Sequence, residues 1–193
     1  MLQIVTAPNA ILSQIAKPVS RVDSSILKLI KEMKEALLSA NDPKGVGLAA
    51  PQVGASIRIF QIKPQDKSEI STFINPVIEK TFGEKEIPNF KNSKKAQAKK
   101  PKASKDKLLE GCLSLPNIWG NVARPKKVML SWQDEFGAHF EKIFSGFPAI
   151  IIQHEIDHLN GVLFPKRVLE QKNKLYKSEK DKKGEDFFEE IEI

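Results

Sequence analysis

The chain has 193 residues, 40% of them hydrophobic and 28% charged, which fits one globular domain and excludes a disordered chain. No apolar run approaches the roughly 18 residues that span a bilayer, and the first twenty residues carry no secretory signal pattern. The formal net charge is +7, and the one cysteine, Cys112, excludes an internal disulfide and fits a reducing compartment. We therefore expect a single-domain cytoplasmic protein without a membrane contact.

The first part of the chain predicts one helix followed by two strands. After Asp23, a favourable N-terminal cap, apolar residues recur at helical spacing: Ile26, Leu27, Ile30, Met33, Leu37 and Leu38. The sequence NDPKGVG at residues 41–47 ends this helix, because proline and glycine do not continue it. Residues 57–62 and 72–78 have the composition of strands.

Lysine-rich residues 91–107 account for the whole net charge. They contain eight lysines and one aspartate, so the rest of the chain sums to zero. Because a stretch of Lys, Ala and Ser cannot form a core, we interpret residues 84–107 as a solvated loop inserted into a neutral domain. The alternative is an RNA contact made by this stretch, while nothing in the charge pattern indicates DNA.

The second part of the chain predicts a hairpin and a buried helix. Residues 128–132 and 138–144 have the pattern of antiparallel strands joined by a short turn. A strongly apolar helix follows from about Pro148 to Leu159, with Gly161 at its end. Strands gathered around one buried helix indicate an α+β fold.

The predicted elements suggest a simple division of the chain. We expect residues 1–169 to form one domain that carries the chemistry. Residues 170–193 are a charged mixture, from which we expect a C-terminal helix or tail.

Residues 154–158, HEIDH, match the HExxH pattern on the predicted buried helix. Residues four apart share a helix face, so His154 and His158 can present imidazole nitrogens to one metal ion. Glu155 lies beside that face, where it can take a proton from an attacking water. The alternative, a core helix whose histidines are satisfied by hydrogen bonds, would bury costly polar groups in an apolar segment.

A catalytic metal site needs a third protein ligand. A histidine six residues after His158 would extend the motif, but Phe164 stands there, and Glu179 lies about twenty residues on in the charged tail. Cys112 is the remaining candidate, since the glycine before it and the serine after it suit a strand end near a ligand. Two imidazoles and a thiolate leave one position open and suit zinc, iron(II), nickel or cobalt.

Three segments resemble the signature motifs of the peptide deformylase family, and they occur in the family's order: GVGLAAPQ at 45–52, EGCLS at 110–114 and QHEIDH at 153–158. The resemblance implies an α+β fold with antiparallel sheets around a central helix that carries HExxH. It also implies hydrolysis of the N-formyl group from the N-terminal formylmethionine of nascent polypeptides, which releases formate. The expected metal is Fe(II), with Ni, Co or Zn as possible replacements.

The resemblance implies a role for each residue of the site. The metal would be bound by Cys112, His154 and His158, and Glu155 would act first as general base and then as acid. The oxyanion would be held by Gln52 and the backbone N–H of Leu113. Each such donor is typically worth about 3 kcal/mol.

The substrate is expected to lie along exposed backbone and apolar side chains near these residues. An extended peptide could pair with the glycine-rich segment as an added strand, and its methionine side chain could pack on the helix. The residues expected to contact it are Gly45, Val46, Gly47, Gly111, Ile150 and Ile151.

Two other interpretations stay open. A metallopeptidase could use HExxH with Glu179 as the third ligand, and a ribosome- or RNA-associated module could retain a relict enzyme domain. The chain departs from the family pattern in its lysine-rich loop and at residues 165–167, PKR, where an acidic residue is more usual. Because the metal ligands are intact, we expect an enzyme that contacts the ribosome near the exit tunnel, through residues 91–107 or the C-terminal tail.

Overall fold

The computed structural model of the chain describes residues 2–41, 44–89, 108–180 and 186–192. The helical segments in these ranges are the 3₁₀ turns η1 (Ala10–Ser13) and η2 (Ala50–Val53) and the helices α1 (Ser24–Ser39), α2 (Phe147–Leu159) and α3 (Phe164–Glu170). None of the helices in the described ranges is long and apolar enough to cross a bilayer. The lysine-rich residues 91–107 lie outside the described residues.

The strands of the described ranges form two antiparallel sheets. The larger sheet has the order β1 (Gly47–Ala49), β2 (Ile59–Ile62), β3 (Ser71–Glu86), β6 (Arg124–Gln133) and β7 (His139–Ser145). The smaller sheet has the order β4 (Glu110–Cys112), β5 (Leu115–Gly120), β8 (Leu175–Lys180) and β9 (Asp186–Glu190). The predicted hairpin is confirmed as β6 and β7, whereas β3 continues past residue 78 to Glu86, into the start of the predicted loop.

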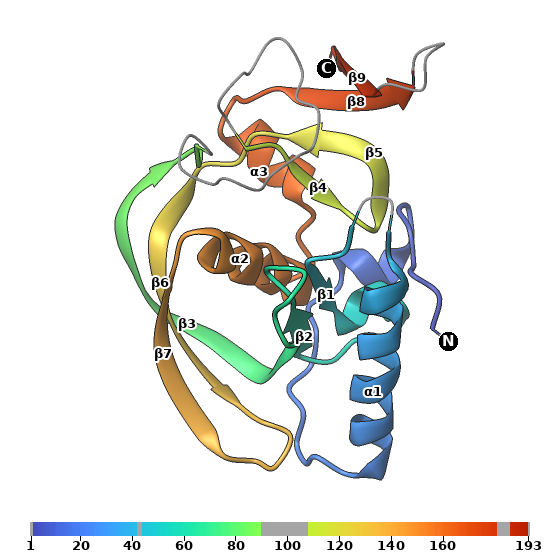
Figure 1. Cartoon of the computed structure of the whole chain (residues 1–193), viewed down its shortest axis with the longest axis vertical. Helices are drawn as coiled ribbons and strands as arrows, with labels where there is room; N and C mark the ends of the chain where they lie inside the picture. The colour runs from blue at the N-terminus through green and yellow to red at the C-terminus, as the bar shows by residue number, and fades with distance from the viewer. Residues whose placement is uncertain (1, 42–43, 90–107, 181–185, 193) are drawn as a thin grey trace.

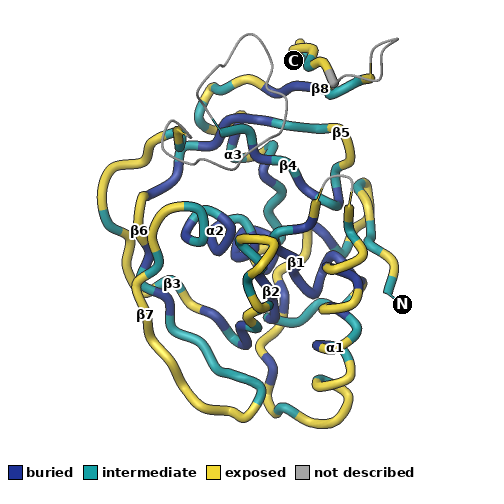
Figure 2. Tube along the Cα trace, in the orientation of Figure 1, coloured by how far each residue is buried: buried dark blue, intermediate teal, exposed yellow. Residues whose placement is uncertain are grey.

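Helix α2 runs through the middle of the molecule, and the larger sheet curves around it (Figure 1). The helix begins after Gly146, whose φ of 64° turns the chain out of β7, and Pro148 sits in the first turn, where its missing N–H is no loss. Its far end is tied down because the Leu159 carbonyl accepts from the Ala16 N–H (2.9 Å) and from Arg58 (3.3 Å). Figure 2 shows the helix as largely buried, so its side chains are held in fixed positions.

Helix α1 confirms the predicted N-terminal helix. The Asp23 carboxylate accepts two backbone N–H groups of the first turn, as an N-terminal cap does. Ile30 and Met33 are buried, but Leu27 and Leu38 are 45% and 51% exposed. The helix packs against the rest of the protein along one side only. Its buried face is therefore narrower than the series of apolar residues in the sequence, and part of that series is exposed.

The structure corrects the expectation of a helix or tail after residue 170. Helix α3 ends at Glu170, and the chain then forms the strands β8 and β9. Strand β8 pairs with β5, which buries Leu175 and Tyr176. An edge hairpin exposes alternate side chains, which are charged in this segment. The few apolar residues that anchor the hairpin are therefore hard to recognise in the sequence.

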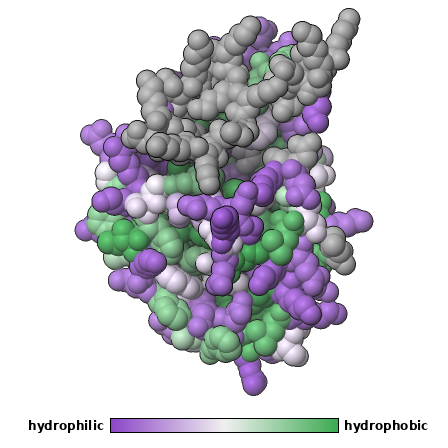
Figure 3. Space-filling view, in the orientation of Figure 1, coloured by the Kyte–Doolittle hydropathy of each residue, from purple (hydrophilic) through white to green (hydrophobic). Residues whose placement is uncertain are grey.

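Large hydrophobic side chains are scattered over the described surface among hydrophilic ones, and Figure 3 shows both kinds interspersed on one face. Phe136, in the turn between β6 and β7, is 93% exposed, and Ile15 is 73% exposed. Single exposed hydrophobic residues are normal in globular proteins and do not mark a binding site by themselves.

Candidate active site

Three potential metal ligands converge where β4 meets α2. One donor atom each from Cys112, His154 and His158 lies within 4.8 Å of the others, and Cys112 Sγ is 3.1 Å from His158 Nε2. Bonds of about 2.0–2.3 Å to a single ion hold such donors roughly 3 to 4 Å apart. The structure therefore brings together the three residues that the sequence analysis selected, at a spacing that suits a shared ion.

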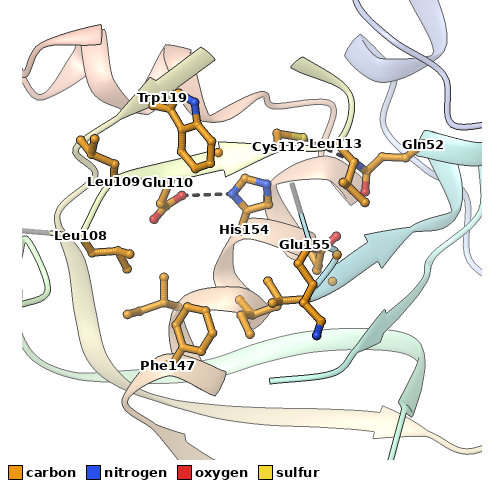
Figure 4. A pocket seen from close by; sticks show the side chains of 17 residues that line it. Gln52, Leu108, Leu109, Glu110, Cys112, Leu113, Trp119, Phe147, His154 and Glu155 are labelled. Atoms are coloured by element: carbon orange, nitrogen blue, oxygen red, sulfur yellow. Dashed lines mark hydrogen bonds and ion pairs between the residues drawn. The ribbon is translucent and has the colours of Figure 1, made fainter. Parts of the chain in front are cut away.

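Glu110 orients one of the two histidines, and Figure 4 shows this contact as a dashed line. Its Oε2 is 3.0 Å from His154 Nδ1. Burial would raise the pKa of Glu110, but the Arg124 guanidinium beside it lowers that pKa to about 2, so the carboxylate is ionised. Because an ionised carboxylate only accepts, Nδ1 carries the proton and Nε2 is left free to bind a metal.

A buried arginine links the two elements that carry the ligands. Arg124 on β6 donates to Glu110 from Nε (2.6 Å) and Nη2 (2.9 Å), and to Asp157 of α2 from Nη1 (3.0 Å). Asp157 also accepts from Arg167 of α3, at 2.8 Å from Nη2. These ion pairs fix β4 against α2, and thus set the positions of Cys112 and the histidines relative to one another.

Glu155 is buried beside the ligand cluster, and burial raises its pKa to about 7. Its Oε2 and the Nδ1 of His158 have no hydrogen-bond partner among the described residues. Buried polar atoms are nearly always paired, so the unpaired Oε2 of Glu155 beside the cluster suits a group that engages a water or a substrate. Gly47 faces this carboxylate, and a side chain there would overlap Glu155 Oε1.

Gln52 from η2 reaches the same cluster. Its Oε1 accepts the Ala49 N–H at 2.9 Å, which fixes the amide. Its Nε2 then donates toward Cys112 Sγ (3.4 Å) and Ser114 Oγ (3.2 Å). Leu113 follows Cys112 and lines the same pocket. Preorganised N–H donors beside a ligand cluster are suited to stabilise negative charge that develops on an oxygen.

An apolar pocket of about 350 Å³ lies against the cluster, walled by the edge strands β1 and β4 and by α2 (Figure 4). Glu155 and Gln52 line it together with the potential ligands Cys112 and His154. The six residues expected to contact substrate all line this pocket: Gly45, Val46, Gly47, Gly111, Ile150 and Ile151.

Comparison with known proteins assigns the family. The model of the polypeptide deformylase family matches residues 1–174. The chain belongs to this family. A peptide deformylase of Synechocystis sp. is 38% identical over 163 residues, which cover 83% of this chain and 75% of that protein. One from Pseudomonas aeruginosa is 39% identical over 165 residues, which cover 85% and 84%.

The fold of this deformylase family member also matches solved structures. The crystal structure of a peptide deformylase from Legionella pneumophila has a TM-score of 0.70 and 38% identity, and the match covers 86% of this chain and 85% of that one. The expected deformylase-like α+β fold is confirmed. Strands β8 and β9 lie beyond residue 174, where the family match ends.

The alternative of a metallopeptidase with Glu179 as third ligand is wrong. Glu179 lies on β8, and its Oε1 pairs with Lys177 Nζ at 2.7 Å. In the part of the chain that the structure describes, the cluster of potential ligands consists of Cys112, His154 and His158. The tail that carries Glu179 is anchored to β5, away from these residues in the sheet order.

Sequence reasoning gave no role to Arg124, to Trp119 or to Phe147, which lines the pocket. Phe147 could have been found, because it precedes Ile150 and Ile151 by three and four positions on one helix face. Arg124 carries no local signal of its own. It could have been predicted only from the rule that buried carboxylates, here Glu110 and Asp157, need a cation as partner.

Proposed function

We propose that this protein hydrolyses the N-formyl group of the N-terminal formylmethionine of nascent polypeptides and releases formate, as its deformylase family membership indicates. The observation that carries the proposal is the ligand cluster of Cys112, His154 and His158 beside the buried Glu155, on the wall of an apolar pocket. A hydrolase needs these parts together: ligands for a metal, a base and a pocket for the substrate.

Cys112, His154 and His158 would hold one divalent cation. The thiolate and two imidazoles suit a borderline-soft metal, and Cys112 Sγ and His158 Nε2, which lie 3.1 Å apart, are close enough to bind one ion. When bound, such a cation supplies Lewis acidity toward the formyl oxygen and the attacking water. We propose Fe(II), with Ni, Co or Zn as replacements, because the donor set accepts all four.

Glu155 would move the proton of the reaction. As the water oxygen attacks the formyl carbon, the Glu155 carboxylate accepts the proton from that water. The C–N bond then breaks as Glu155 delivers this proton to the amine nitrogen, which leaves formate and a free amino terminus. Gln52 Nε2 and the Leu113 N–H would donate to the oxygen that carries the negative charge in between.

The pocket would select methionine and align the peptide. Val46, Ile150 and Ile151 supply apolar side chains on which the unbranched methionine side chain can pack. The edge of β1 at Gly47 offers unpaired backbone on which an extended substrate can add as a strand. A peptide held in this way brings its formyl group to Glu155.

The function is tested by formate release from formyl-Met-Ala-Ser. The protein would be prepared without oxygen and loaded with Fe(II) or Ni(II). We expect one formate per peptide consumed, and no cleavage of the unformylated peptide Met-Ala-Ser. Absence of formate from a metal-loaded, folded protein would contradict the proposal, and cleavage of Met-Ala-Ser would indicate a peptidase.

Replacing Cys112 with serine should weaken metal binding at least tenfold, because a serine hydroxyl is not ionised near neutral pH and is a poor ligand for these metals. Competition with a chelator at fixed free metal concentration measures this affinity. Ser114→Ala serves as the control for a small change on the same segment, and it should retain most of the metal affinity. Parental affinity in Cys112→Ser would exclude the thiolate as a ligand.

We also propose a cytoplasmic location and a contact with the ribosome near the exit tunnel. Their support is the free thiol of Cys112, which a reducing compartment preserves, and the charge of residues 91–107. Neutralising the lysines of 91–107 should weaken ribosome binding and flatten its dependence on salt concentration, as loss of phosphate contacts does. Sedimentation with ribosomes at several salt concentrations measures both, and an unchanged salt slope would contradict the contact.

A further inference from the structure

Trp119 on β5 is a pocket residue that is held in place by the C-terminal hairpin. Its ring lies on the pocket wall, on the opposite side from Phe147 in Figure 4. The indole Nε1–H donates to Ser178 Oγ of β8 at 2.9 Å. The Phe188 ring of β9 packs edge-on against the indole, with ring centroids 5.9 Å apart at 71°.

The other side of the indole lies against Gly111. A Cβ at Gly111 would stand 2.6 Å from the Trp119 ring, so the ring occupies the space of the missing side chain. Gly111 and Trp119 are also directly opposite each other in the pairing of β4 with β5. The indole is therefore held between β4 on one side and the β8–β9 hairpin on the other.

This arrangement lies next to the path of a bound peptide. Gly111 precedes Cys112 on β4, and β4 is an edge strand. A peptide whose formyl group reaches the ligand cluster and that continues along this edge passes Gly111 within one or two residues, since each residue of a strand spans about 3.3 Å. The half-buried Trp119 ring is the large aromatic surface at that point.

We propose that Trp119 is a specificity-determining residue that favours an aromatic side chain at the second or third position of the formylated peptide, and that Ser178 and Phe188 are positioning residues for it. The inference rests on the proposed deformylase function and deepens it. It assigns a role to β8 and β9, which lie beyond the part of the chain that the family model matches.

The expected preference follows from the geometry of aromatic pairs. Two aromatic rings in stacked or edge-to-face contact gain roughly 0.5–1.5 kcal/mol beyond their burial, which corresponds to about two- to tenfold in kcat/KM. The indole is already fixed by a hydrogen bond on one edge and by a glycine on one face. It therefore loses little conformational entropy when a substrate ring packs against it.

The test compares kcat/KM for the formylated peptides fMet-Phe-Ser and fMet-Ser-Ser, and for fMet-Ala-Phe and fMet-Ala-Ser. The parent should favour phenylalanine over serine about two- to tenfold at one of the two positions. Trp119→Ala should bring that ratio close to one, and Trp119→Phe, which keeps a ring but loses the indole N–H, should retain part of it.

The positioning residues are tested with a matched pair on β9. Phe188→Ala and Ser178→Ala should each lower the ratio, whereas Phe187→Ala, the neighbouring residue with a 43% exposed side chain, should leave it at the parental value. A merely structural role would scale kcat/KM for all peptides equally and leave the ratio unchanged. The ratio thus separates positioning from loss of folded protein.

The outcomes distinguish this inference from the function on which it rests. Formate release with equal kcat/KM for Phe and Ser at both positions would overturn the inference and leave the deformylase function standing. A ratio that survives Trp119→Ala, or that falls equally in Phe187→Ala and Phe188→Ala, would also overturn it. No formate from any of the four peptides would overturn the proposed function and the inference together.

Discussion

Replacing Glu155 with glutamine should lower kcat for formate release by about 10²–10⁴-fold, the usual contribution of a positioned general base. Glutamine keeps the size of the side chain but cannot accept the proton of the attacking water. Metal content should stay at the parental level, because the proposed ligand atoms belong to Cys112, His154 and His158. Formate assays on metal-loaded protein, with metal analysis of the same sample, measure both quantities.

Glu141→Gln is the matched control for this substitution. Glu141 lies on β7 with an exposed side chain, so the same chemical change should leave kcat near the parental value. A Glu155→Gln variant that keeps its metal and hydrolyses the formyl group at the parental rate would rule out Glu155 as the proton carrier.

Glu155→Gln should also raise the free energy of unfolding of the metal-free protein above neutral pH. Burial raises the pKa of Glu155 to about 7, so the folded state binds a proton more tightly than the unfolded state does. A raised carboxyl pKa means that stability is lost as pH rises from about 4.5 to 7. Metal-free Glu155→Gln lacks this loss, so it should unfold at a higher urea concentration than the parent at pH 8.

Replacing Arg124 with methionine should destabilise the protein by about 3–5 kcal/mol, because it leaves Glu110 and Asp157 buried without their common cation. The neighbouring Arg167 pairs with Asp157, at 2.8 Å from its Nη2, and so cannot take the place of Arg124 beside Glu110. Urea unfolding of the metal-free protein at pH 7 measures the difference. The exposed Arg21→Met is the control and should change the free energy of unfolding by less than about 0.5 kcal/mol.

The pH dependence of the Arg124 variant provides a second test. In the parent, Arg124 outweighs burial and lowers the pKa of Glu110 to about 2, so the ion pair stabilises the fold above about pH 4.5 and this stability is lost as pH falls toward 2. Arg124→Met removes the largest cause that lowers the pKa of Glu110 and leaves only the smaller effect of His154, so most of this acid sensitivity should disappear. Adding Glu110→Gln should recover part of the lost stability. A loss below 1 kcal/mol in the single variant would show that the carboxylates do not depend on Arg124.

Much of the local structure could be predicted because its signals are local. The capped helix after Asp23 and the hairpin of residues 128–144 follow from periodicity and turn residues within each segment. The buried helix with HExxH was located to within one residue, since its apolar composition and the glycines around it lie next to each other in the chain. For the same reason the sequence predicted His154 and His158 as a pair on one helix face.

The sequence analysis was wrong where structure depends on partners far away in the chain. Residues 175–190 form strands because β5 offers an edge on which Leu175 and Tyr176 are buried, and this edge is not visible in their own charged sequence. Leu27 and Leu38 belong to the apolar series of α1, yet they are exposed, because the neighbouring strands cover only one side of the helix.

The candidate donors and the candidate base could be predicted from the sequence alone: two histidines and a glutamate on one helix, and a single cysteine to join them. The pairing of Arg124 with both Glu110 and Asp157, and the support of Trp119 by the C-terminal hairpin, became visible only in the fold. A helix face is fixed by bonds between residues three and four apart, which a sequence displays. The partner of a buried charge or ring is fixed by packing between segments that are distant in the chain, which only the fold reveals.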